Sequence, residues 1–435
     1  MSGALRVLCI GHAHSPQFPQ RCAMLQSAGF HVTEMTGQAE AVTPGADALQ
    51  PRGLPLGRAW RLTALSRFAH FFALVRGLAP DLLFVQYAQG LWAWLATTTG
   101  LPVVVSVMGG DVLFDEQADP GPLQRAATLG CLRDASLVLC KSAYLADRVR
   151  AMRPHGEVRI AAWGVDRAVF RPARNAEEKS AARRQAGLPE KGPLLFSPRA
   201  LQPLYNIKTI VRAFARSGLA DQDAHLALST FHADQTCEAE VRGLCREQGL
   251  EKSVHFLPPL DAQGMARMYC AADLGISVPD SDGLPQTLFE AAACGLPLIL
   301  RDLPNYRAEL RRHEAALLVG PDAPDKKSEE LTSALRLLAT DPDLRQRLAQ
   351  GAARFAREHE RDSGANALPV LFQRAAQQHG ARQGVRLAQL LRTVATLFQG
   401  PAPVARRGQP VFPGLRTYVR ALLHSVPDRR NANRS

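Results

Sequence analysis

The sequence has eight cysteines but lacks a CxxC pair and any Cys/His spacing that is typical of a structural zinc site. Cys9, Cys140 and Cys294 lie in or beside apolar runs, where an unpaired cysteine behaves as a small hydrophobic residue. We therefore expect reduced thiols, a reducing cytosolic environment and no structural zinc.

We also expect no secretory signal in this segment, because the first apolar run, 5–10, is short and contains Arg6. Residues 82–110 carry no charged side chain, so a membrane span has to be weighed. Two glutamines and a Gly-Leu-Pro break at 100–102 favour a strand, a helix and a second strand over a span.

Acidic side chains are scarce in the C-terminal segment 361–435, which has 12 arginines and 2 aspartates and contributes +10 to the net charge of +12. Apolar residues recur there at helical spacing in 387–398 and 415–426. Basic amphipathic helices of this kind suit an anionic membrane surface, and a solvated face or packing against the body is the alternative. No aromatic stacking platform accompanies the arginines, which argues against nucleic acid as a partner.

A chain of 435 residues exceeds what one hydrophobic core usually serves, which predicts two domains. Short apolar runs alternate with helical patterns, as expected for an α/β protein with parallel sheets covered by helices on both faces. The predicted strands are residues 5–10, 82–86, 103–107 and 137–140 in the first half, and 194–198, 224–229, 254–257, 274–278 and 298–300 in the second.

Changes in composition along the chain suggest where the domains begin and end. We expect a first domain over 1–170, a polar linker over 171–190, a second domain over 191–360 and a basic helical tail over 361–435. No solenoid repeat is visible.

The segment 277–299 joins a predicted strand, a Gly/Pro loop and a helix, and it places Asp282 and Glu290 eight residues apart. Gly283 lets the loop amides, including that of Leu284, approach an anion, and the helix start offers unpaired N–H groups to a phosphate. Glu290 can accept hydrogen bonds from the two hydroxyls of a ribose, and Asp282 from those of a sugar. The pattern indicates a nucleotide-sugar site, although alone it also fits a buried helix with one Glu after an Asp-Gly turn.

Further motifs occur in a characteristic order along the chain. They are residues 11–15 with 28–32, 79–85, 107–112, 163–172, and 197–214 followed by the segment 277–299. In this order the chain resembles a retaining glycosyltransferase of the GT-B fold, family four ("glycosyl transferases group 1"), over residues 5–360. The resemblance implies two Rossmann-like, doubly wound parallel-sheet domains that face a cleft. It also implies that the first domain binds the acceptor and the second the donor.

The resemblance assigns roles to individual residues. Glu290 corresponds to the carboxylate that holds the donor ribose, and Asp282 stands where the family usually has a longer Glu. Arg199 corresponds to an arginine that neutralises the departing diphosphate, whose growing negative charge a fixed cation stabilises. The lysine that accompanies this arginine in the family would fall near Tyr205, which makes Lys208 the candidate substitute.

The first domain carries the remaining positions that the resemblance implies. Gly11 corresponds to a glycine near the phosphates, and Gly110 with Asp111 to a loop beside the donor sugar. Many members have a His where this chain has Gln86, and a His often stands where it has Met108. His12 and His14 either compensate for these changes or are plain loop residues.

Asp280-Ser281-Asp282 is formally a DxD motif, the metal-binding signature of another glycosyltransferase fold. Arg199 and the helix start already provide positive charge for a diphosphate. We therefore expect a metal-independent site with no cofactor other than the donor substrate.

These observations predict a bacterial enzyme that transfers a sugar from a nucleoside-diphosphate sugar to an acceptor hydroxyl with retention. Residues 56–78 mix arginines with aromatics, which suits either a lipid interface or a core helix with a basic face. With the basic tail, they favour a cytoplasmic enzyme at the inner face of the plasma membrane. Its acceptor would be a glycan or lipid-linked precursor of lipopolysaccharide, capsule or exopolysaccharide. The alternatives are a non-catalytic GT-B-shaped membrane adaptor or inactive subunit, and a sugar-nucleotide epimerase.

Overall fold

The computed structural model describes residues 4–12, 15, 17–36, 64–114, 122–153, 156–161, 163–320, 327–359 and 367–378. These residues form two compact units. The first comprises the described parts of Met1–Lys141, Leu145–Ala161 and Ala367–Ser435, and the second comprises Ser142–Tyr144 and the described parts of Ala162–Asn366.

The described part of the first unit contains a six-stranded parallel sheet in the order β2-β1-β3-β4-β5-β6. Four of these strands, β1, β3, β4 and β5, coincide with predicted ones. The two edge strands were not predicted, because each mixes polar with apolar residues and is only partly buried. The strands are β1 (Arg6–Gly11), β2 (His31–Thr36), β3 (Leu82–Gln86), β4 (Val103–Ser106), β5 (Leu137–Cys140) and β6 (Glu157–Ile160).

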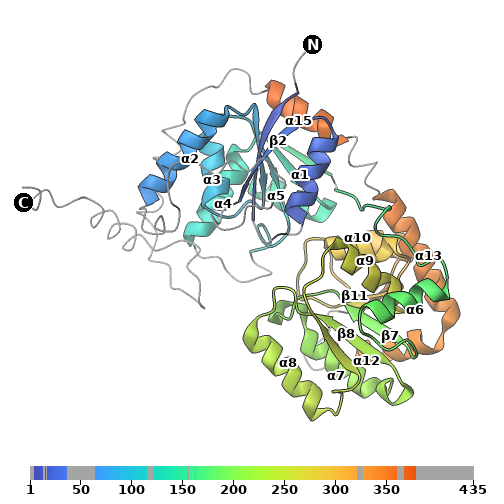
Figure 1. The fold of residues 1–435 in the computed structure, drawn as a ribbon. Coiled ribbons are helices and arrows are strands. Elements are labelled where there is room, and N and C mark those ends of the chain that lie inside the picture. Colours follow the sequence, from blue (N-terminus) through green and yellow to red (C-terminus); the bar gives the residue numbers. More distant parts are fainter. Residues whose placement is uncertain are drawn as a thin grey trace, which may run out of the picture. The chain divides into compact units, whose positions relative to one another are not determined.

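Helices cover both faces of this sheet, with α2 and α3 on one side and α1 and α15 on the other (Figure 1). The fully buried ring of Phe372 in α15 packs on Phe30 and Phe84, with centroids 5.8 and 5.6 Å away. Part of the expected tail is therefore a structural element of the first unit, whereas 387–398 and 415–426 lie outside the described residues. The helices are α1 (Gln17–Ser27), α2 (Ala64–Leu78), α3 (Leu91–Thr98), α4 (Pro122–Asp134), α5 (Ala143–Met152) and α15 (Ala367–Gln378).

The uncharged segment 82–110 forms the strand, helix and strand that its breaks predict, namely β3, α3 and β4. Within the part of the chain that the structure describes, no helix has the length and apolar character that crossing a membrane requires. In α2 the side chain of Phe71 is fully buried beside Trp92, at a centroid distance of 5.6 Å. This aromatic therefore belongs to the core and is not available to a lipid surface.

The described part of the second unit contains another six-stranded parallel sheet, in the order β12-β11-β10-β7-β8-β9. The edge strand β12 was not predicted, and the other five were. Together the two sheets confirm the expected α/β fold with two doubly wound, Rossmann-like domains. The strands are β7 (Leu194–Ser197), β8 (His225–Ser229), β9 (Val254–Leu257), β10 (Leu274–Ser277), β11 (Leu298–Arg301) and β12 (Leu317–Val319).

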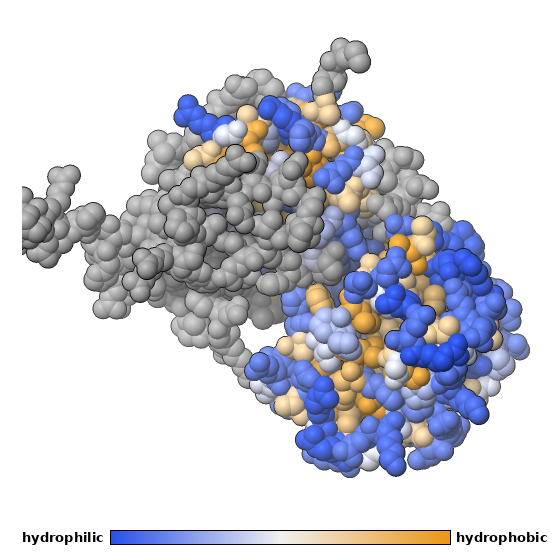
Figure 2. Space-filling view, in the orientation of Figure 1, coloured by the Kyte–Doolittle hydropathy of each residue, from blue (hydrophilic) through white to orange (hydrophobic). Residues whose placement is uncertain are grey.

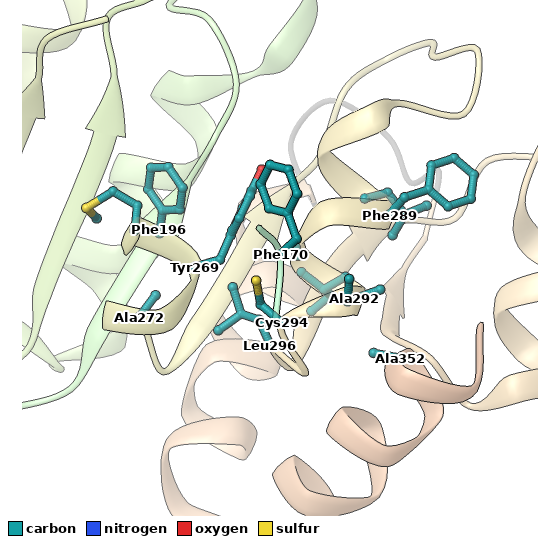
Figure 3. Packing of buried hydrophobic residues seen from close by; sticks show 14 of the residues in the cluster. Phe170, Phe196, Tyr269, Ala272, Phe289, Ala292, Cys294, Leu296 and Ala352 are labelled. Atoms are coloured by element: carbon teal, nitrogen blue, oxygen red, sulfur yellow. The ribbon is translucent and has the colours of Figure 1, made fainter. Parts of the chain in front are cut away.

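Two hydrophobic clusters fill the space on either side of the second sheet. One involves α6, α9, α10, α11 and α13, and its rings and small side chains interlock closely (Figure 3). The other involves α7, α8 and α12. Hydrophilic residues cover most of the visible rim of this unit (Figure 2). The helices are α6 (Ala176–Gln185), α7 (Ile207–Ser217), α8 (Gln235–Glu247), α9 (Ala262–Ala271), α10 (Gln286–Ala293), α11 (Arg307–His313), α12 (Lys327–Thr340) and α13 (Pro342–Glu358), with short 3₁₀ turns η2 (Pro203–Tyr205) and η3 (Ala220–Gln222).

The segment 171–190, which the sequence analysis treats as a linker, contains helix α6 of the second unit. Asn175 caps this helix by accepting a hydrogen bond from the Glu178 amide at 2.8 Å. Arg183 is buried, donates to the Ala271 carbonyl at 3.0 Å and forms an ion pair with Asp273 at 2.6 Å. The polar composition of the segment 171–190 predicted a linker, but part of the segment is a helix that a buried arginine holds in place.

Candidate functional site

The loop between β10 and α10 has an unusual backbone. Leu284 is fully buried and has a φ of 70°, a left-handed conformation that costs a branched side chain about 1 kcal/mol or more. Pro285 then occupies the N-cap position of α10, which begins at Gln286, and no side chain caps the first turn of that helix. The loop therefore leaves helix-end N–H groups without a side-chain acceptor, as a phosphate-binding turn requires.

Arg199 and Asp282 form an ion pair at this loop. Arg199 Nη2 lies 2.9 Å from Asp282 Oδ2, and the side chains are only 8% and 9% exposed. The guanidinium also stacks 4.2 Å from the ring centroid of Tyr205 and donates to Thr287 Oγ1 at 3.3 Å. Burial lowers the pKa of Arg199, but the charge of Asp282 together with Tyr205 and Tyr306 outweighs it, so the pKa lies above its usual value.

The other contacts of Asp282 fix its position without using all of its acceptor capacity. Its Oδ1 accepts a hydrogen bond from the Gly283 amide at 2.7 Å, and its backbone carbonyl accepts one from Asn305. Although Oδ2 is buried within ion-pair distance of Arg199, it accepts no hydrogen bond from the described residues. This oxygen can therefore accept one from a ligand hydroxyl.

The two aspartates of the DxD motif have different partners. Asp280 accepts a hydrogen bond from Asn206 Nδ2 at 2.9 Å, whereas Asp282 pairs with Arg199. Within the described ranges, no cluster of three or more His, Cys, Asp or Glu side chains is arranged to hold a metal ion.

Glu290 lies in α10 and its carboxylate is held by a tyrosine that the sequence analysis did not single out. Tyr269 Oη donates to Glu290 Oε2 at 3.3 Å, and both side chains are buried. The tyrosine ring packs near Phe170 and Phe196 (Figure 3), with centroids 6.2 and 5.6 Å away. Burial, followed by the charge of Glu290, raises the pKa of Tyr269 well above its usual value, so the hydroxyl stays a donor.

A small, mainly apolar cavity lies against this group of residues. Its lining includes Pro198 at the end of β7, Ser277 at the end of β10, Thr287 and Leu288 of α10, and Tyr306. The cavity thus borders the carboxyl ends of adjacent parallel strands, where open α/β sheets bind their ligands.

Lys208 does not join this group. It lies in the first turn of α7, its side chain is 40% exposed, and its Nζ pairs with Glu240 Oε2 of α8 at 2.6 Å. The expectation that it substitutes for a second diphosphate-binding cation stays a prediction, and in this structure its ammonium group pairs with a carboxylate outside the group. The helical register directs the side chain toward α8.

Asp111 in the first unit, which was expected in a loop beside the donor sugar, is held by backbone amides. Its fully buried carboxylate accepts hydrogen bonds from the amides of Ala88 at 2.7 Å and of Met108 and Gly109 at 2.9 Å. Burial raises the pKa of this carboxyl, and these amide hydrogen bonds act against the rise. Asp111 is therefore a positioning residue that fixes the loop containing Gly110, whose carbonyl accepts from Gln89 at 3.3 Å.

Gly11 is required by packing. A Cβ atom at this position would lie 2.2 Å from the ring of Phe18, which is buried at the start of α1. At the end of β3, Gln86 Nε2 donates to Ser15 Oγ at 3.0 Å, and the next residue, Tyr87, adopts a φ of 82°. Of the positions that depart from the family pattern, Gln86 thus lies at the carboxyl end of β3.

Sequence models of two known families match the chain. Residues 16–164 match the glycosyl transferase 4-like domain, and residues 178–355 match glycosyl transferases group 1. The two matches cover the motif segments 28–32, 79–85, 107–112, 197–214 and 277–299, whereas 11–15 and most of 163–172 lie outside them.

Curated relatives and solved structures agree with these matches. The D-inositol 3-phosphate glycosyltransferase of Jonesia denitrificans is 26% identical over 310 residues, which are 68% of this chain and 72% of the relative. The protein of that name from Thermomonospora curvata is 31% identical over 202 residues, or 45% of this chain and 46% of the relative. This chain therefore spans 46% to 72% of the length of these two relatives.

Two solved structures share the fold. Sucrose-phosphate synthase from Thermosynechococcus elongatus superposes with a TM-score of 0.68 at 20% identity, covering 85% of this chain and 98% of that one. Alr3699/HepE from Anabaena, solved with UDP and glucose, gives a TM-score of 0.65 at 14% identity, covering 85% and 99%.

Proposed function

Because the chain belongs to the glycosyl transferases group 1 family of glycosyltransferases, we propose that it transfers a sugar from a nucleoside-diphosphate donor to an acceptor hydroxyl with retention. The observation that carries this proposal is the buried group around Arg199 and Asp282 at the start of α10. It combines a fixed cation, uncapped helix N–H groups and a carboxylate oxygen with spare acceptor capacity.

Each part of this group matches one part of such a donor. The helix start and Arg199 would bind the diphosphate and stabilise the charge that grows on it as the glycosidic bond breaks. The carboxylate of Glu290, held by Tyr269, would accept hydrogen bonds from the ribose hydroxyls. Asp282 Oδ2 would accept one from a sugar hydroxyl. Alr3699/HepE, with the same fold, has been solved with UDP and with UDP-glucose, which supports a donor of this class.

Retention is inferred from the family resemblance. In a front-face reaction the bond from the anomeric carbon to the diphosphate breaks while the bond to the acceptor oxygen forms on the same side. The acceptor proton passes to the departing phosphate. This route needs no protein nucleophile.

Calorimetric titration of the full chain with UDP, GDP and ADP, with and without EDTA, tests the donor site. We expect one diphosphate to bind regardless of EDTA, and Glu290→Ala to abolish that binding. Glu240→Ala is the matched control, because this exposed carboxylate pairs with Lys208 outside the site. Failure of a folded protein to bind any of the three would overturn the donor proposal and favour a non-catalytic role.

The acceptor has two candidates. The name of the curated relatives favours a phosphorylated inositol. The basic composition of 361–435 favours a lipid-linked or cell-surface glycan, reached by an enzyme attached to the inner face of the plasma membrane. Incubation of the enzyme with its donor and either D-inositol 3-phosphate or lipid-linked oligosaccharide, followed by mass spectrometry, distinguishes them, and the anomeric proton of the product reports retention.

A further inference from the structure

Arg301 is a buried arginine at the same edge of the second sheet, and its Nε has no acceptor in the part of the chain that the structure describes. It is the last residue of β11, the strand that pairs with β10, and only 7% of its surface is exposed. Its Nε atom is buried without a hydrogen-bond acceptor, and among the described residues no carboxylate forms an ion pair with its guanidinium. Burying a cation in this way is costly unless an anion compensates it.

The neighbouring charges already compensate one another. Arg199 is matched by Asp282, and Lys208 by Glu240. Asp302, which follows Arg301 in the chain, pairs with Arg307 and Arg311. Among the described residues, Arg301 therefore has no carboxylate within ion-pair distance in the group that borders the loop between β10 and α10.

Tyr306 connects Arg301 with the candidate donor site. This buried tyrosine lines the cavity together with Thr287, to which Arg199 donates. Burial raises the pKa of Tyr306 well above its usual value, the charge of Asp282 raises it further, and Arg199 and Arg301 each lower it. One phenol thus senses the charges of both arginines and of the donor-loop carboxylate, and Arg301 ends the strand that pairs with β10, after which the donor loop begins.

We propose that Arg301 is the second cation of the donor site and binds the diphosphate together with Arg199. The inference rests on the proposed function. A nucleoside diphosphate carries more than one negative charge, and Asp282 already offsets Arg199, so a second cation is needed to neutralise it. As the glycosidic bond breaks, its electron pair stays on the diphosphate oxygen. Arg301 stabilises the resulting negative charge while the acceptor hydroxyl gives its proton to the departing phosphate.

The test compares ligands that differ only in phosphate content. Wild type, Arg301→Gln and Arg301→Lys are titrated with UDP, UMP and uridine, with the GDP and ADP series, and with inorganic pyrophosphate. Arg301→Gln should weaken the binding of the nucleoside diphosphate and of pyrophosphate by about tenfold or more. It should weaken the binding of the monophosphate less and leave the affinity for the nucleoside unchanged. Arg301→Lys should restore part of the lost affinity. Arg311→Gln is the matched control, because this nearby arginine pairs with Asp302 and its side chain is 63% exposed.

Thermal unfolding of the ligand-free protein separates binding from a structural role. If Arg301 has no protein partner, Arg301→Met should leave the melting temperature unchanged or raise it, whereas a structural arginine would lower it. A lower melting temperature for Arg301→Met would overturn the inference. So would an equal loss of affinity for the diphosphate and for the nucleoside in Arg301→Gln.

Failure of this inference can be told apart from failure of the proposed function. Unchanged diphosphate affinity in Arg301→Gln would overturn the role of Arg301 and leave the donor proposal standing. If pyrophosphate binds in a way that depends on Arg301 but no nucleoside diphosphate binds, the anion-binding role of Arg301 would be supported and the donor proposal overturned. Binding of none of these ligands to wild type would overturn both.

Discussion

Arg199 and Asp282 form a buried ion pair of 2.9 Å that connects the segment after β7 to the loop after β10. The pair joins two loops at the carboxyl ends of adjacent strands, and it places a cation and a carboxylate beside an uncapped helix start. Its energetics differ from those of an exposed ion pair, because removal of one partner leaves the other charged and out of water.

Asp282→Ala should lower the free energy of unfolding by about 3 kcal/mol, because Arg199 would remain buried without its counter-charge. Replacing both residues, as in Arg199→Met with Asp282→Ala, should recover most of that loss. Urea unfolding of the two single variants and the double variant measures the coupling. Additive losses in the double variant would show that the pair contributes no interaction energy.

Tyr269→Phe should weaken nucleoside-diphosphate binding by about fivefold to tenfold, because Glu290 loses a hydrogen bond worth about 1 kcal/mol. The ring packing against Phe170 and Phe196 is retained, so the melting temperature should change little. Calorimetric titration beside Glu290→Ala, which should bind no diphosphate, gives the comparison. Wild-type affinity in Tyr269→Phe would show that the tyrosine does not support the carboxylate.

Gly11→Ala should destabilise the first unit by about 1–3 kcal/mol, because the new Cβ would lie 2.2 Å from the ring of Phe18. Phe18→Leu in the same chain should relieve part of the clash. Gly77→Ala in α2 is the control, because nothing lies within 4 Å of its added Cβ, and it should stabilise the helix by about 0.5–1 kcal/mol. Chemical denaturation measures all three, and equal effects at the two glycines would contradict the packing role of Gly11.

Stability should depend on pH through His359. Its Nε2 lies 3.2 Å from Glu309 Oε2, and its Nδ1 lies 2.9 Å from the Phe355 carbonyl. Burial lowers the pKa of His359, but these contacts outweigh it and hold the pKa above its ordinary value of 6.5. The protonated ring therefore stabilises the folded state fully below pH 6.5, and this contribution is lost as the pH rises through the higher folded-state pKa.

His359→Gln isolates that contribution from those of the other histidines. The difference in unfolding free energy between wild type and variant should be largest at mildly acidic pH and shrink above neutrality. Denaturation curves across pH 5.5 to 8.5 test this, and a difference that grows with pH would show the opposite sign of coupling.

The sequence allowed the central strands of both sheets to be predicted, but not β2, β6 or β12. Central strands of a parallel sheet are buried on both faces and form short apolar runs. In the edge strands β2 and β6, Glu34, Glu157 and Arg159 interrupt the apolar pattern, whereas the edge strand β9 was predicted and β12 is an apolar run of only three residues. The helix α6 was missed for a related reason, because its buried contacts depend on an arginine.

The candidate donor loop could also be identified from sequence, since Gly283, Glu290 and the following helix lie within one short segment. The partners of these residues could not. Tyr269 belongs to another helix, and Arg301 ends a strand whose sequence resembles any other apolar strand. The direction of Lys208 toward Glu240 follows from helical register and from the packing of α7 against α8.

By itself, the sequence determined the α/β alternation, the glycosyltransferase family and the loop that would meet a diphosphate. These properties depend on local periodicity, turn residues and short motifs, which involve residues close together in the sequence. Only the tertiary structure decided that Asp282 pairs with Arg199, that the carboxylate of Asp111 is used by backbone amides, and that the buried Nε of Arg301 has no acceptor among the described residues. Charge compensation depends on distances and burial between residues far apart in the chain, and only the folded packing fixes those.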